Sequence, residues 1–206
     1  MENLKRIILM LVVLTATIGL QAQNATSWQN AFYKSYEAER AGKYANAINV
    51  LKPEYKSGDY FINLRLGWLF YLNKQYDASE KYYQLAIKLK PYSIEARFGY
   101  VKPLSARENW EMVKKQYEEI LKIDPQNTIA SYWLGVIYYN RAEYKQAVKL
   151  FEKIVNLYPL DYDSVIMLAW TKLNLGKGAE AGILFNHALT LKPNDESSKA
   201  GLKLIK

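Results

Sequence analysis

The sequence predicts an all-α fold, an α-α superhelix (solenoid) of about five helix pairs that ends in a C-terminal capping helix. Four prolines recur at a fixed interval of 34 residues, and each follows a helical run. A proline just beyond a helix prevents its continuation, because proline lacks a backbone N–H and clashes with the preceding turn. Only ten glycines and six prolines occur in 206 residues, which suits long helices better than many short strands. Each recurring proline should therefore end the second helix of a pair; they are Pro91, Pro125, Pro159 and Pro193.

The 34-residue interval divides the chain into repeated units. The unit at 128–161 is the clearest and carries Leu134-Gly135, Tyr138, Ala147, Phe151 and Pro159. This pattern resembles the tetratricopeptide repeat family, whose units are pairs of antiparallel helices. The resemblance implies that neighbouring pairs stack into one continuous core, since a single pair cannot bury its apolar faces alone. It places a solenoid domain at 23–206, with repeats at about 28–59, 60–93, 94–127, 128–161 and 162–195 and a cap at 196–206.

Two units depart from the family pattern. The unit at 94–127 has Pro103 inside its first helix, where it should kink or end that helix. We expect the helix to end near Lys102, with a short loop to Glu108. The unit at 28–59 lacks a closing proline, and Pro53 should shorten its second helix.

Small residues and a cap complete the predicted architecture. Asn194 or Asp195 can cap a short final helix. The apolar residues of that helix, Leu202, Leu204 and Ile205, should cover the last pair. The small residues expected where two helices approach closely are Gly67, Gly135, Ala147, Ala181 and Ala188.

Residues 1–22 have the features of a secretory signal peptide. Lys5 and Arg6 precede an uncharged, apolar run at 7–20, and cleavage would leave Gln23 as the new N-terminus. The alternative is a retained membrane anchor, but a 14-residue helix spans only about 21 Å of the roughly 30 Å hydrocarbon core. We therefore expect an exported protein without a membrane span after cleavage, in the periplasm or associated with the outer envelope.

Composition argues against catalysis and against nucleic-acid binding. The chain has no cysteine and a single histidine, His187, so thiolate sites and histidine-based metal or triad chemistry are hard to build. The phosphate-loop and hydrolase motifs are missing, and we expect neither an enzyme nor a bound cofactor or metal. The net charge is +8, but the lysines are scattered, which favours a solvated basic surface over a nucleic-acid site.

The family resemblance also implies where a partner would bind. In tetratricopeptide repeats the first helix of each pair lines a concave groove. Aromatic rings with polar edges are favoured in binding surfaces, so the implied function is a non-catalytic protein–protein interaction scaffold or adaptor for a peptide or partner helix. Carbohydrate or peptidoglycan stacked on the same rings is the alternative, the rings could instead pack between repeats, and self-association stays open. The candidate groove residues are Phe32, Tyr36, Trp68, Tyr71, Phe98, Lys102, Tyr132, Tyr139, Trp170 and Asn174.

Overall fold

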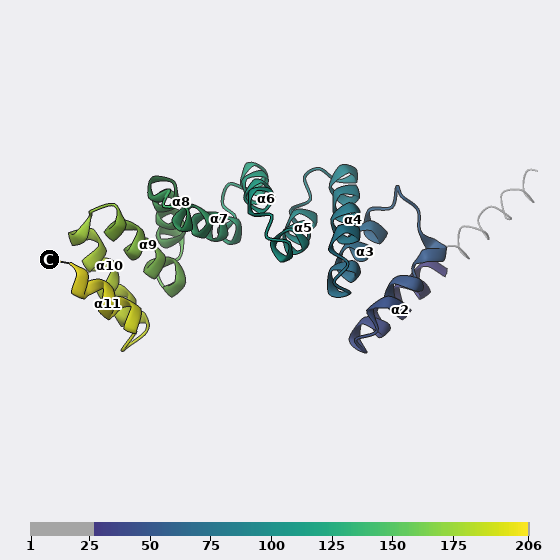
Figure 1. The fold of residues 1–206 in the computed structure, drawn as a ribbon, viewed down its shortest axis with the longest axis horizontal. Coiled ribbons are helices and arrows are strands. Elements are labelled where there is room, and N and C mark those ends of the chain that lie inside the picture. The colour runs from purple at the N-terminus through teal and green to yellow at the C-terminus, as the bar shows by residue number, and fades with distance from the viewer. Residues whose placement is uncertain (1–26, 206) are drawn as a thin grey trace, which may run out of the picture. The chain divides into compact units, whose positions relative to one another are not determined.

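The computed structural model describes residues 27–205, and every regular element in this range is a helix (Figure 1). The leader predicted at 1–22 lies outside the described residues. The chain divides into two compact units, the first ending at Pro103 and the second beginning at Leu104. Within 27–205, no helix has the length and apolar character that crossing a membrane requires.

Unit 1 begins with a pair whose second helix is short. The N-terminal helix covers 27–40, and its partner α2 (Tyr44–Asn49) gives way to the single 3-10 turn η1 (Lys52–Glu54). Pro53 lies in that turn and offers no N–H to continue α2, as predicted. The remaining helices of the unit are α3 (Tyr60–Leu72), α4 (Tyr76–Leu89) and the part of α5 (Ile94–Ala106) up to Pro103.

Tyr83 of α4 fixes how closely the helices of unit 1 approach. A Cβ added to Gly67 would lie 3.0 Å from the Tyr83 ring, and one added to Gly99 would lie 2.2 Å from it. A side chain at Gly99 would therefore collide with the ring, and one at Gly67 would make a tight contact with it, which agrees with the close approach predicted at Gly67. The rest of the core is aliphatic, with Ile62, Leu66 and Leu69 of α3 against α2.

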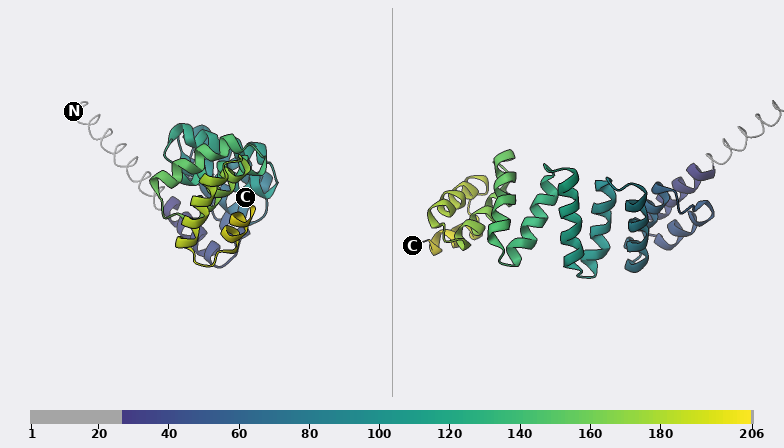
Figure 2. Two further views of the ribbon diagram at one scale, coloured as in Figure 1. Left: turned by 90° about the vertical axis from the view of Figure 1, so that its left-hand side faces the viewer. Right: turned by 90° about the horizontal axis from the view of Figure 1, so that it is seen from above.

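Unit 2 continues the alternation of first and second helices (Figure 2). The second helices α6, α8 and α10, like α4 in unit 1, each end two residues before one of the recurring prolines, as the spacing predicts. Neighbouring helices in sequence contact one another from α6 to α11. The helices are α6 (Trp110–Ile123), α7 (Thr128–Asn140), α8 (Tyr144–Leu157), α9 (Tyr162–Asn174), α10 (Gly178–Leu191) and α11 (Glu196–Leu204).

Two buried phenylalanines organise the core of unit 2. A Cβ on Gly135 would lie 2.8 Å from the ring of Phe151, and one on Gly201 would lie 2.1 Å from the ring of Phe185. Close helix contacts therefore depend on glycine here as well. The predicted small residues Ala147, Ala181 and Ala188 are fully buried.

Pro103 does not end its helix. We expected the helix to stop near Lys102 with a loop to Glu108, and this was wrong. Helix α5 is 13 residues long, as α3 is, and it runs through Pro103 to Ala106. Inside the helix, Pro103 removes one backbone hydrogen bond, and its ring crowds the carbonyl of Gly99. The burial gained by packing a full-length first helix outweighs that loss, because tertiary packing supplies most helical stability in proteins.

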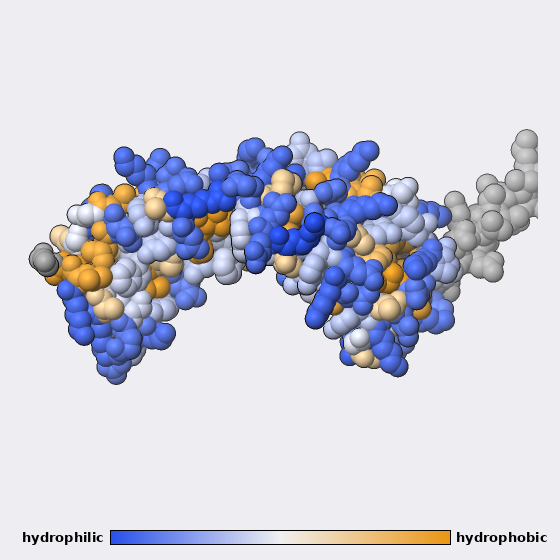
Figure 3. Space-filling view, viewed as in Figure 1, coloured by the Kyte–Doolittle hydropathy of each residue, from blue (hydrophilic) through white to orange (hydrophobic). Residues whose placement is uncertain are grey.

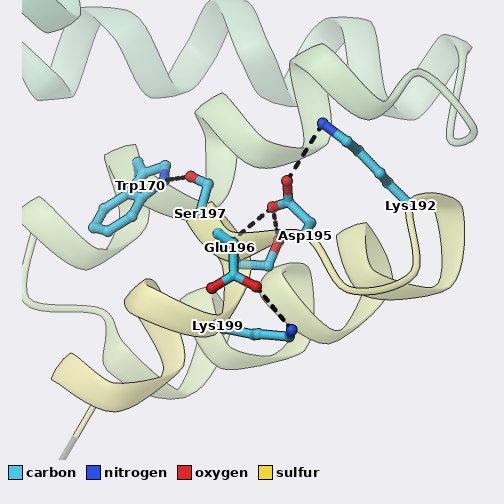
Figure 4. A network of polar contacts seen from close by, with 7 residues as sticks. Trp170, Lys192, Asp195, Glu196, Ser197 and Lys199 are labelled. Atoms are coloured by element: carbon cyan, nitrogen blue, oxygen red, sulfur yellow. Dashed lines mark hydrogen bonds and ion pairs between the residues drawn. The ribbon is translucent and has the colours of Figure 1, made fainter.

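The C-terminal helix α11 closes unit 2 as a cap. The carboxylate of Asp195 accepts hydrogen bonds from the backbone N–H and the hydroxyl of Ser198, each at 2.8 Å (Figure 4). Leu202 and Ile205 pack against the core beneath. Leu204 was expected to join them, but it is 63% exposed, because it lies on the outward face of the helix. Hydrophobic surface is visible over α10 and α11 in Figure 3.

Candidate binding groove

The first helices of unit 1 enclose a hollow of about 1010 Å³. The N-terminal helix, α3 and α5 each contribute side chains one helical turn apart, such as Phe32 with Tyr36 and Phe98 with Lys102. We call this hollow the aromatic groove. Its lining includes Phe32, Tyr36, Glu39, Arg40, Phe61, Leu64, Arg65, Trp68, Glu95, Phe98 and Lys102.

Two rings of the aromatic groove are open to a ligand. Phe61 is 55% exposed and Tyr36 is 46% exposed. Phe32 lies one turn before Tyr36 on the N-terminal helix, and the two ring centroids are 6.5 Å apart. Exposed apolar faces of this kind, gathered in one hollow, are the usual composition of a binding site.

An ion pair between buried Arg65 and partly buried Glu39 holds the floor of the groove in place. Arg65 of α3 is 7% exposed and pairs with Glu39 of the N-terminal helix. The second carboxylate oxygen of Glu39 accepts a hydrogen bond of 2.6 Å from the indole nitrogen of Trp68. The Arg65 guanidinium also lies 3.8 Å from the centroid of the Tyr36 ring. One carboxylate thus positions, directly or through Arg65, two of the rings that line the groove.

Cationic side chains stand at the edge of the aromatic groove. Lys102 and Arg40 are exposed, and the Lys102 ammonium lies 5.5 Å from the centroid of the Trp68 ring. The lining also has two carboxylates. Glu39 is paired with Arg65, whereas Glu95 is not. The groove therefore combines flat apolar rings with a slightly positive rim.

The predicted residues of unit 1 converge, with one exception. Phe32, Tyr36, Trp68, Phe98 and Lys102 all line the aromatic groove. Tyr71 does not line it, and its ring lies between Trp68 and Tyr76, with centroid separations of 5.7 and 6.0 Å.

The predicted residues of unit 2 do not meet in one hollow. Tyr139 accepts a hydrogen bond of 3.2 Å from the side-chain amide of Asn174, so these two pair with each other. Trp170 packs edge-on against Phe185 and donates to the hydroxyl of Ser197 on the cap at 2.9 Å (Figure 4). The sequence analysis left open whether these rings bind a ligand or pack inside the protein. The ring of Trp170 packs against Phe185.

Tyr132 lines a different hollow, of about 640 Å³, which we call the rim pocket. The rim pocket lies where α7 begins, α8 ends and α9 begins. Its members come from three helix ends, and no single helical spacing in the sequence connects all of them. Besides Tyr132, its lining includes Ile129, Trp133, Leu157, Tyr158, Leu160, Asp161, Asp163 and Ser164.

Sequence reasoning also missed Arg65 and Glu39. Arg65 is the charged residue of helix α3, which is mostly apolar, and a buried cation needs a nearby acid. That signal marks Arg65 as exceptional, but it does not identify Glu39, which lies 26 residues earlier. Across residues 27–205, no three metal-ligating side chains are grouped so as to hold an ion.

Comparison with known proteins agrees with this fold. Two models of the tetratricopeptide repeat family match the chain, one over residues 34–94 and the other over residues 130–161. The helix pairs, the 34-residue period and these matches together show that the chain belongs to the tetratricopeptide repeat family. Repeats of this family generally mediate protein interactions. No curated protein matches the sequence.

Several solved structures share the fold at low sequence identity. MamA is 17% identical, with a TM-score of 0.69 over 82% of this chain and 93% of that chain. MamA from Desulfovibrio magneticus RS-1 is also 17% identical, with a TM-score of 0.68 over 82% and 97%. A tetratricopeptide repeat protein from Parabacteroides merdae is 19% identical, with a TM-score of 0.73 over 87% and 72%. At these identities the likeness concerns the fold alone.

Proposed function

We propose that this chain is a non-catalytic protein–protein interaction scaffold that binds a peptide segment or a partner helix in the aromatic groove. The observation that carries the proposal is the convergence of five side chains from three helices on one hollow. These residues lie on the first helices of their pairs, on the face that lines the binding groove in tetratricopeptide repeats. Membership of the tetratricopeptide repeat family supports the same class of function.

The chemistry of the aromatic groove suits apolar side chains on a protein segment. The exposed faces of Phe61 and Tyr36 can each cover an aliphatic or aromatic side chain. The contacts among Glu39, Arg65 and Trp68 fix the floor before binding, which lowers the entropy lost when a partner docks. Among the described residues that line the groove none is histidine, and Glu39 is committed to Arg65, which leaves Glu95 as the remaining carboxylate of the lining.

We further propose that the scaffold works in the bacterial cell envelope after removal of its leader. The support is the charge of Lys5 and Arg6 followed by the apolar run at 7–20. N-terminal sequencing of the protein purified from an envelope fraction tests this. A mature chain that starts at or within a few residues of Gln23 agrees with export, whereas an intact leader would mean a retained anchor.

A capture experiment with matched variants tests the binding role. The mature chain is immobilised, proteins retained from an envelope extract are identified, and each is purified and titrated by calorimetry. The groove variant combines Phe61→Ser with Lys102→Glu, both at exposed positions that should tolerate change. The control is Tyr92→Ser, because Tyr92 is 83% exposed, belongs to the same unit and does not line the groove.

Binding that the groove variant loses and the control keeps would agree with the proposal. Equal binding by the wild type, the groove variant and the control would exclude the groove as the site. If no protein is retained, the chain should be tested on insoluble peptidoglycan. Retention there that depends on Phe61 would make polysaccharide the ligand class instead.

A further inference from the structure

The rim pocket of unit 2 gathers an unusual share of exposed apolar side chains. Ile129, Trp133, Leu157, Tyr158 and Leu160 are between 47% and 76% exposed, and all of them line this one hollow. Single exposed apolar residues are common on protein surfaces, but several in one contiguous patch mark an interaction site. The patch lies within unit 2, so its argument is independent of the aromatic groove.

The backbone holds these side chains in a fixed arrangement. Ile129 and Trp133 are one turn apart on α7 and therefore share a face. Leu157 is the last residue of α8, and Pro159 keeps Tyr158 out of the helical conformation. The turn that follows is closed by a hydrogen bond of 3.0 Å from the Asp161 N–H to the Tyr158 carbonyl. A partner would therefore meet a preformed surface.

Carboxylates give the rim pocket the opposite charge to the aromatic groove. Asp161 precedes α9 as its N-terminal cap, yet within residues 27–205 its carboxylate makes no capping hydrogen bond to a backbone N–H of α9 and instead accepts the Ser164 hydroxyl at 2.5 Å. Asp163 is exposed in the first turn of α9. Among the described residues that line the pocket, none is lysine or arginine. The lining therefore carries the opposite sign of charge to the chain as a whole, whose net charge is +8.

The titration of a neighbouring tyrosine agrees with this negative field. Burial raises the pKa of the Tyr132 hydroxyl, and the charges of Asp163 and Asp161 raise it further. Both carboxylates therefore act on the interior of the pocket as well as on its edge.

We propose that the rim pocket docks a basic amphipathic segment of a partner protein. Apolar side chains of the segment cover Leu160 and Ile129, and a lysine or arginine between them reaches Asp161 and Asp163. The exposed rings of Trp133 and Tyr158 can cover the aliphatic stem and charged head of that cation. Charge complementarity selects this occupant, because an acidic segment would face two carboxylates with no cation to offset them.

Fluorescence polarisation with two synthetic peptides tests the proposal on the mature chain. One labelled peptide carries leucine and lysine at helical spacing, and the other has glutamate in place of each lysine. The charge variant is Asp161→Asn with Asp163→Asn, which keeps a residue able to begin α9. A second variant, Leu160→Ser, alters a side chain that is 76% exposed and should leave the fold intact. Circular dichroism melts confirm that each variant is folded.

We expect the leucine–lysine peptide to bind, with affinity at least tenfold weaker in the charge variant and in Leu160→Ser. We expect the Phe61→Ser/Lys102→Glu groove variant to bind this peptide as the wild type does. The test of the rim pocket is therefore independent of whether the aromatic groove binds a partner. Equal binding of both peptides, or affinity unchanged by the charge variant, would overturn the proposal. A dimer in sedimentation velocity that Leu160→Ser abolishes would also overturn it, because the occupant would then be a second copy.

Discussion

Glu39 of the N-terminal helix accepts the indole N–H of Trp68 on α3 at 2.6 Å, which ties the first helices of two successive repeats together. The same carboxylate pairs with buried Arg65. Glu39 thus stabilises the fold, and it also shapes the aromatic groove, because Trp68 lines that groove. A change at Glu39 should therefore affect both the stability of the fold and the shape of the groove.

Replacing Glu39 should lower the free energy of unfolding. Glu39→Gln preserves an acceptor for Trp68 but leaves the Arg65 cation without its partner, and breaking such a pair costs about 2–3 kcal/mol at a site that is partly solvated. Urea denaturation of wild type and variant measures the difference. Replacing both partners, as Glu39→Leu with Arg65→Met, should recover most of it. A single variant as stable as the wild type would show that the pair contributes little.

Gly99→Ala should destabilise the protein although alanine favours helices. The new Cβ would stand 2.2 Å from the Tyr83 ring, and overpacking of this kind costs about 1–3 kcal/mol, more than the gain of about 1 kcal/mol in helix propensity. Gly182→Ala is the matched control, since its Cβ would meet Ile205 at 3.4 Å and should be neutral or stabilising. Thermal unfolding compares the two variants. Equal melting temperatures would contradict the close contact.

The cap on α11 should make stability depend on pH in acid. Burial alone would raise the pKa of Asp195, but hydrogen bonds from Tyr162 and Ser198 and the nearby Lys192 ammonium lower it to about 2. Because the folded pKa lies below the unfolded value of 3.8, the stabilisation is complete above about pH 4 and is lost as pH falls toward 2. The loss should amount to about 1–2 kcal/mol.

Denaturant titrations at several pH values between 2 and 5 measure this contribution. Asp195→Asn still offers a capping oxygen but does not titrate, so its free energy of unfolding should fall less steeply over the same range. Identical slopes for wild type and variant would mean that other carboxylates carry the acid sensitivity.

The helix ends could be predicted from sequence because their cause is local. A proline acts on the turn next to it, and Pro125 and Pro159 each lie two residues beyond a helix end. Pro103 misled the same reasoning, because it lies three residues before the end of α5, where the packing of a whole helix outweighs one lost hydrogen bond. Local rules fail where their energy is small beside the burial of a helix face.

The candidate sites could be predicted only in part, for a related reason. Helical spacing identifies a face, and in unit 1 that face became the lining of the aromatic groove. Spacing does not say what covers a face, and Trp170 proved to contact the cap through Ser197. The rim pocket joins the end of one helix to the beginnings of two others, including Leu160 in a turn, and no period in the sequence connects them.

Photocrosslinking in living cells tests the groove most directly. The photoreactive amino acid p-benzoylphenylalanine replaces Phe61 in one strain and Tyr92 in another; both side chains are exposed in unit 1, and only Phe61 lines the groove. If the aromatic groove holds a partner segment, light should join the Phe61 position, and not the Tyr92 position, to a specific envelope protein. Crosslinks of equal yield at both positions, or only at Tyr92, would contradict binding in the groove.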